Sequence, residues 1–108
     1  MTEDANEKMS AKDDTLLLVS GSKGDKEYVK KLANAIAQVY GKHSAAKLRC
    51  VGAASLNNGI KAFIIAKGEA QKNGDNLLIS PSFTTVSFQG EEKTGIVLEV
   101  CSLSNPQP

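Results

Sequence analysis

The hydrophobic period of this sequence switches twice between that of a strand and that of a helix, and two strand-like runs then follow. The apolar run at residues 16–19 ends at Ser20-Gly21 and predicts a buried strand. Asp25 is placed to cap a helix after it, in which apolar residues recur at helical spacing. Gly41 is placed to end that helix.

The next two segments repeat this order with a different balance of apolar residues. Residues 46–51 alternate, with Lys47 and Arg49 on one face, and predict a half-exposed strand. Ser55 is a candidate N-cap for a second helix, which ends near residues 72–74. This helix is apolar beyond a single stripe, so we expect it to be buried on two sides, by the sheet and either the other helix or another subunit.

The remaining pattern predicts a hairpin. Residues 77–79 begin a third strand, and Pro81 within it indicates an edge position or a bulge. A turn at residues 89–93 leads to a fourth strand at residues 94–101. The order β-α-β-α-β-β predicts an α/β domain of the α+β two-layer sandwich type. Its four-stranded mixed sheet carries both helices on one face.

Length and composition limit the number of domains and tails that the chain can contain. It has 108 residues, of which 41% are apolar, which is enough for one core. Residues 1–14 have no hydrophobic period and predict a disordered acidic tail, followed by a domain over residues 15–103 and a loose tail over residues 104–108. No apolar run approaches the ~20 residues of a membrane helix. The start of the chain does not have the pattern of a signal peptide, so we expect a cytoplasmic protein, or a nuclear one where the cell has a nucleus.

Charge and cysteine content indicate which partners the domain could attract and whether it has disulfide bonds. Residues 1–14 carry a net charge of −3, and residues 15–108 carry eleven Lys and Arg against seven Asp and Glu. A mildly basic domain attracts polyanions, although this excess is also ordinary for a soluble surface. Cys50 and Cys101 lie in apolar runs and are expected to be reduced core thiols, with a disulfide or a metal pair as the alternative.

Three stretches of the chain together resemble the stage V sporulation protein S family. They are residues 19–22 with the alanine-rich segment 32–37, the segment 51–62 (VGAASLNNGIKA), and residues 79–84 with 90–94. The resemblance implies an Alba-like fold, the fold of a small dimeric protein that binds chromatin and RNA. Gly21-Ser22-Lys23 followed by Tyr28-Val29 is similar to an Alba segment whose lysine touches nucleic acid.

The sequence departs from the pattern of one family or the other at three places, one of which is Lys67, where the sporulation family has an arginine after the second helix. Ala53-Ala54 stands where Alba has a Gly-Arg pair that meets phosphates, and the sporulation family also lacks that arginine. Gly59 replaces an alanine within the helix, which costs roughly 1 kcal/mol of helix stability unless close packing requires a glycine.

Candidate nucleic-acid contacts are polar residues near the predicted helix starts and on one strand face. Lys23 lies between two glycines before a helix N-terminus, where anions are favoured, although a glycine turn with a solvated lysine has the same pattern. Lys47 and Arg49 also fit a merely solvated sheet face. The complete candidate set is Ser22, Lys23, Lys26, Lys47, Arg49, Asn57, Asn58 and Lys61.

Other chemistry has little support in the sequence. His43 is the sole histidine and has no cluster of ligands or bases near it, so we expect no catalytic residue, no metal, no cofactor and no enzymatic activity. Phe88 near the hairpin turn is the one aromatic residue expected to be exposed, and the other aromatic residues fall mostly on core positions.

Two functions therefore remain. The first is an Alba-type module that binds DNA or RNA weakly, through the backbone and without strong sequence preference. The second is a protein-interaction or assembly module with no nucleic-acid role. In either case the apolar second helix predicts a homodimer or larger homo-oligomer.

Overall fold

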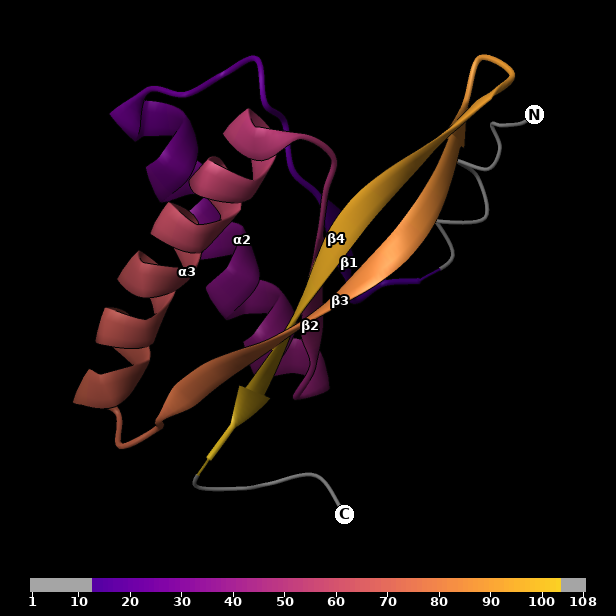
Figure 1. Ribbon diagram of the computed structural model, residues 1–108. Helices are drawn as coiled ribbons and strands as arrows, with labels where there is room; N and C mark the ends of the chain where they lie inside the picture. The colour runs from indigo at the N-terminus through magenta and orange to yellow at the C-terminus, as the bar shows by residue number, and fades with distance from the viewer. Residues whose placement is uncertain (1–12, 104–108) are drawn as a thin grey trace.

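The computed structural model describes residues 13–103 and contains the predicted order of elements (Figure 1). The elements are β1 (Leu16–Leu18), α2 (Lys26–His43), β2 (Ala46–Cys50), α3 (Ala53–Lys72), β3 (Leu77–Phe88) and β4 (Glu91–Ser102). The strand order in the sheet is β1-β2-β4-β3, with β1 parallel to β2 and the other two pairs antiparallel. Both helices cover one face, so the predicted mixed two-layer fold is confirmed.

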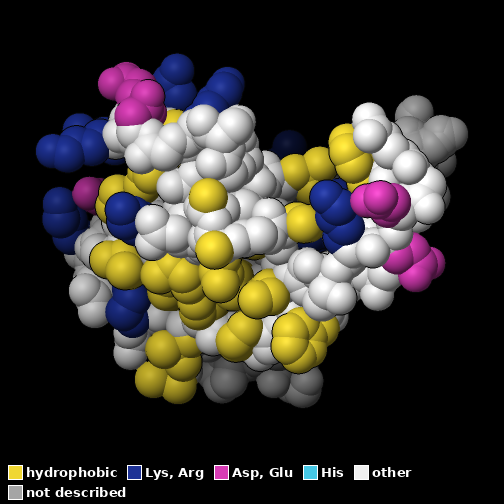
Figure 2. All heavy atoms as spheres, turned by 45° about the horizontal axis from the view of Figure 1, so that its top comes forward, with side chains coloured by type: hydrophobic (Ala, Val, Ile, Leu, Met, Phe, Trp, Pro, Cys, Tyr) yellow, Lys and Arg dark blue, Asp and Glu magenta, His cyan; other side chains and the backbone are white. Residues whose placement is uncertain are grey.

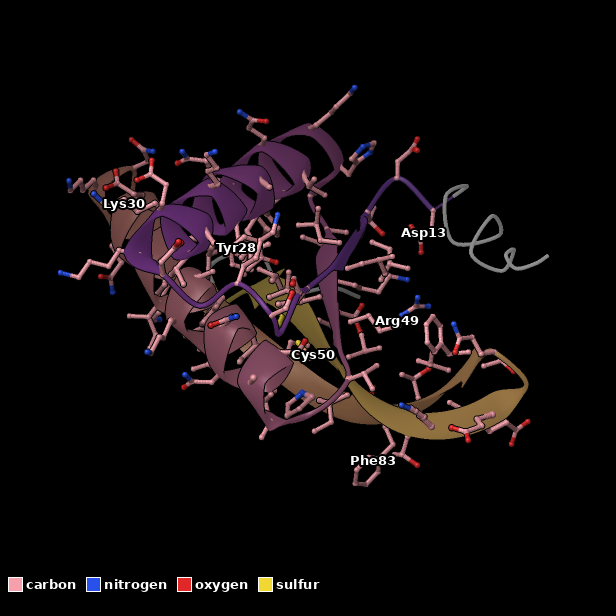
Figure 3. The ribbon with its side chains drawn as sticks, turned by 90° about the horizontal axis from the view of Figure 1, so that it is seen from above. Asp13, Tyr28, Lys30, Arg49, Cys50 and Phe83 are labelled. Carbon is pink, nitrogen blue, oxygen red and sulfur yellow. The ribbon has the colours of Figure 1, made fainter. Side chains whose placement is uncertain are left out.

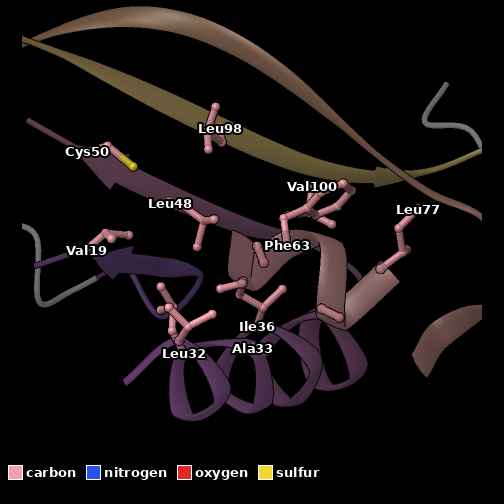
Figure 4. Packing of buried hydrophobic residues seen from close by; sticks show 14 residues of the cluster. Val19, Leu32, Ala33, Ile36, Leu48, Cys50, Phe63, Leu77, Leu98 and Val100 are labelled. Atoms are coloured by element: carbon pink, nitrogen blue, oxygen red, sulfur yellow. The ribbon is translucent and has the colours of Figure 1, made fainter. Parts of the chain in front are cut away.

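The core lies between that face of the sheet and the two helices (Figure 4). Leu48 at the centre of β2 and Ile36 of α2 are both fully buried. The apolar stripe of the first helix supplies four buried side chains, which are Val29, Leu32, Ala33 and Ile36. Of the two cysteines, Cys50 belongs to this core, whereas Cys101 is half-buried, and both are free thiols. Burial raises the pKa of the Cys50 thiol.

Both predicted helix boundaries at small residues are wrong. The first helix passes through Gly41 and ends at His43. Its C-cap is Ser44, which adopts a left-handed conformation (φ 56°) and donates its backbone N–H to Tyr40 O. The second helix begins at Ala53 after Gly52 (φ +95°), and Ser55 lies inside its first turn. A buried acceptor explains this position of Ser55, because its Oγ donates a hydrogen bond of 2.8 Å to Val19 O.

The hairpin is longer and more regular than predicted. β3 continues through Pro81, which is tolerated because β3 is an edge strand. The turn consists of only Gln89 and Gly90, both with positive φ, as a tight hairpin of right-twisted strands requires. Because β2 pairs with β4 only over residues 96–100, residues 84–88 and 91–95 form a two-stranded hairpin arm. Its five residue pairs, at about 3.4 Å per residue, correspond to a length of roughly 17 Å. The arm projects beyond the body of the sheet (Figure 1).

The glycine within the second helix is explained by close packing. A Cβ at Gly59 would lie 3.0 Å from Cys50 Sγ and 3.6 Å from a methyl group of Leu98. α3 therefore sits on the sheet at a distance that leaves no ordinary space for an alanine. Close packing of α3 on the sheet therefore explains why glycine occurs here despite its lower helix propensity.

We predict that Gly59→Ala alone will not stabilise the protein, because the gain in helix propensity of about 1 kcal/mol is lost to the contact with Cys50. In a Cys50→Ala background the sulfur is absent, and the same change should raise the free energy of unfolding by about 1 kcal/mol. Urea denaturation of the four proteins measures this coupling. Equal effects of Gly59→Ala in both backgrounds would show that Cys50 does not dictate the glycine.

The predicted tails lie mostly outside the described residues. Residues 1–12 and 104–108 are not part of the description, so their predicted disorder stays a prediction. Asp13, assigned to the acidic tail, is held in the structure. Its carboxylate accepts hydrogen bonds from the backbone N–H and the hydroxyl of Thr15, at 3.0 and 2.6 Å.

Candidate nucleic-acid interface

The loop between β1 and α2 is held by two side chains from the helical layer. Asn58 of α3 donates its amide to Ser20 O at 2.9 Å and to Lys23 O at 2.7 Å. Tyr28 Oη accepts a hydrogen bond of 2.8 Å from the backbone N–H of Ser20. These contacts place the backbone of Lys23 beside the first two turns of α3, with its side chain exposed.

The N-terminus of α3 is open to an anion. Gly52 supplies no side-chain cap, and the first turn contains no acidic residue. Ala53 and Ala54 are exposed, and Gly21 approaches so closely that a Cβ there would lie 3.1 Å from Ser55 N. The unpaired N–H groups and the helix dipole give this end a partial positive charge.

The N-terminus of α2 is different. Asp25 caps it, and the Asp25 carboxylate accepts the backbone N–H of Tyr28 at 2.8 Å. A carboxylate already occupies the position that the sequence predicted for a phosphate. The helix end available beside Lys23 is therefore that of α3, not that of α2.

A groove of about 430 Å³ runs between the two helices near these ends. Its floor is aliphatic and its rim is basic, and the lining residues are Gly24, Lys26, Val29, Lys30, Lys61, Ile64 and Ile65. Two of the predicted lysines, Lys26 and Lys61, thus meet from different helices. Lys30 was not among the predicted contacts, although its spacing of four residues from Lys26 places both on one side of α2.

The other predicted cations lie elsewhere. Lys47 and Arg49 alternate with buried residues of β2 and face away from the helices. In the view from above, Lys30 and Arg49 lie on opposite sides of the molecule (Figure 3). The structure therefore divides the candidate residues into a loop-and-groove group and a separate pair on the open face of the sheet.

The open-face pair is partly neutralised. Lys47 Nζ lies 3.0 Å from a carboxylate oxygen of Asp13. The hydroxyl of Thr15, together with Lys47, lowers the pKa of Asp13 from 3.8 to about 2. Because this pKa is depressed, the interaction stabilises the fold above pH ~4 and is lost as the pH falls through about 2. Both side chains are more than one-third exposed, so the contribution is small.

The remaining predicted residues differ in their access to solvent. Ser22, Lys23 and Asn57 are exposed. Asn58 is 4% exposed and its amide nitrogen donates two hydrogen bonds to the loop, so it is a positioning residue and not a direct contact.

The surface also carries a band of hydrophobic side chains that crosses α3 and reaches the sheet (Figure 2). Ile64 is 59% exposed and Phe83 is 82% exposed. Phe83 was predicted to be a core residue, and this is wrong because β3 has by then passed beyond the cover of the helices. The prediction for Phe88 is confirmed, since this side chain is 57% exposed.

Two classes of site have no geometric support within residues 13–103. In this range, no three His, Cys, Asp or Glu side chains come together in an arrangement suited to a metal ion. Neither α2 nor α3 is apolar enough to cross a membrane.

The family described as Stage V sporulation protein S matches residues 17–103, which include all of α2, β2, α3, β3 and β4.

Proposed function

We propose that this chain, which belongs to the stage V sporulation protein S family, is a non-enzymatic module that binds nucleic acid through the phosphate backbone. One observation supports the proposal most directly. The uncapped N-terminus of α3 lies beside an exposed Lys23 whose loop Asn58 holds in place. Lys61, two turns into the same helix, adds a second exposed positive charge.

The chemistry of this surface favours phosphate recognition without base readout. Backbone N–H groups and lysine ammonium groups bind phosphate oxygens whatever the base sequence is. The described residues near Lys23 include no exposed aromatic side chain suited to base stacking. We therefore expect weak binding that falls with salt at a logarithmic slope of about −2 to −4.

Charge reversal at Lys23 tests the proposal. Lys23→Glu should weaken binding to labelled duplex DNA and to single-stranded RNA alike, and it should reduce the salt slope by about 1. Fluorescence anisotropy at two salt concentrations measures both quantities. Lys72→Glu, at the opposite end of α3, makes the same change of charge away from the site and should bind nearly as the natural protein does.

Two results would contradict the proposal. Equal binding by Lys23→Glu and the natural protein, with matched thermal midpoints, would remove Lys23 from the site. An absence of binding by the natural protein at low salt would favour a protein-interaction module of this sporulation-associated family.

The hydrophobic band supports a second proposal, that the chain forms a homodimer or a larger homo-oligomer. Ile64 and Phe83 are large apolar side chains that the single chain leaves in water. A homodimer interface resembles a core divided between two chains and covers such residues. This association is compatible with nucleic-acid binding, because the open N-terminus of α3 beside Lys23 lies at the start of the helix, whereas Ile64 lies further along it.

A further inference from the structure

We infer that the groove between α2 and α3 receives the tip of the hairpin arm of a second copy of this chain. The tip consists of Phe88, the turn Gln89-Gly90, and Glu91-Glu92. The inference does not rest on the proposed nucleic-acid function. It identifies a specific contact for the self-association that the hydrophobic surface predicts.

The groove requires a partner with both acidic and apolar groups. Lys26, Lys30 and Lys61 line it, and none of its lining residues is acidic. Its floor includes Ile64 and Ile65, which are 59% and 40% exposed. Aliphatic side chains give nucleic-acid bases no stacking surface, so phosphate groups would satisfy the rim and leave the floor uncovered.

The tip of the arm has the complementary composition. Phe88 is 57% exposed and pairs across the strands with Glu91, which places an aromatic ring and a carboxylate next to each other on one face. Glu92 follows on the other face, and both glutamates are exposed. Within residues 13–103, neither glutamate forms a salt bridge with a Lys or Arg side chain.

The arm is also shaped to reach another molecule. It projects away from the helical layer, and the acidic side chains lie at its far end (Figures 1 and 2). Among residues 13–103, no third strand pairs with its outer five residue pairs. A two-stranded ribbon is only marginally stable by itself, so insertion of its tip between two rigid helices would also stabilise the arm.

The groove and the tip of the arm are thus complementary in both charge and apolar surface. The Phe88 ring lies against the aliphatic floor, and the two carboxylates meet the lysine rim. Opposite charges at such a contact set its orientation and its specificity. The same contact forms whether two copies exchange their arms reciprocally or one copy follows another in a chain.

Sedimentation velocity of the full chain, with exchanged charges, tests the inference. Glu91→Lys/Glu92→Lys carries a basic tip and a basic groove, and Lys30→Glu/Lys61→Glu carries an acidic tip and an acidic groove. Each variant alone should lose the increase of sedimentation coefficient with concentration that the natural protein shows. An equimolar mixture should recover it, because each groove then meets a tip of opposite charge. Phe88→Ser should lose it without any change of charge.

Several outcomes would overturn the inference. These are sedimentation of the tip variants identical to that of the natural protein, failure of the mixture to recover association, and a natural protein that shows no association at all. Nucleic-acid binding is scored separately by anisotropy with duplex DNA, where the tip variants retain the Lys23 site and should bind at least as tightly as the natural protein. Loss of DNA binding in Lys30→Glu/Lys61→Glu with unchanged association would support the proposed function and contradict the arm contact.

Discussion

Leu48→Ala is expected to lower the free energy of unfolding by about 3 kcal/mol, because it removes a large side chain from the centre of the core. Leu48 is 0% exposed and lies between the sheet and both helices (Figure 4). The surrounding side chains belong to different elements and cannot all move inward, so part of the cavity should persist. Equilibrium unfolding in urea, with the slope m held equal, measures the loss.

A leucine-to-alanine substitution in β1, which pairs with β2, is the control for this prediction. Leu18 of β1 is 55% exposed on the open face of the sheet. Leu18→Ala removes the same atoms from a strand and should cost less than about 1 kcal/mol. Similar losses for the two variants would show that the core is centred elsewhere.

Asn58→Ala is expected to destabilise the fold by about 2 kcal/mol and also to weaken nucleic-acid binding, although it removes no charge. The substitution leaves Ser20 O and Lys23 O without their donor and opens space in a buried position. The loop that carries Lys23 then loses its attachment to α3. Amide hydrogen exchange over residues 20–24 should become faster than in the natural protein.

Asn57→Ala provides the matched control. Asn57 is the adjacent residue of the same type but is exposed, so its loss should leave stability within about 0.5 kcal/mol of the natural protein. If both substitutions had the same effect on stability, the hydrogen bonds from Asn58 would not hold the loop. If Asn58→Ala destabilised the protein but left DNA binding unchanged, the position of the loop would not matter for binding.

Sequence patterns predicted the elements well where a single local rule decides. The stripe Val29, Leu32, Ala33 and Ile36 predicted the buried face of α2, since side chains at that spacing must share one side of a helix. Pro81 predicted an edge position or a bulge, because proline has no N–H to donate to a neighbouring strand, and β3 is an edge strand. The resemblance to the sporulation family predicted the match over residues 17–103.

Two predicted helix boundaries were wrong, and at Ser55 a tertiary contact competed with the local rule. Ser55 has the residue type of an N-cap, yet its hydroxyl is taken by Val19 O, which is 36 residues away in the chain. Gly41 has the residue type of a helix end, yet the helix continues to His43, and the left-handed residue is Ser44. The contact between Ser55 and Val19 is not visible in a window of neighbouring residues.

The candidate site shows the same division. Residue types, with the resemblance to Alba at Lys23, made Lys23, Lys26 and Lys61 candidate polyanion contacts, because lysines near a helix start favour anions. They did not show that Asn58 is buried, that Asp25 occupies the N-terminus of α2, or that Lys47 and Arg49 face away from the other lysines.

The sequence by itself therefore determined the order of helices and strands, the family and the candidate residues for the proposed polyanion surface, since each depends on local period or motif. Only the tertiary structure decided which helix N-terminus has no side-chain cap and which lysines share a groove. It also decided that the hairpin extends beyond the part of the sheet that pairs with β2. These features depend on the register of β2 against β4 and on the close packing of α3 on the sheet, where a Cβ at Gly59 would lie 3.0 Å from Cys50 Sγ. Such relations join residues far apart in the chain, and their energies arise from close packing, which no local pattern encodes.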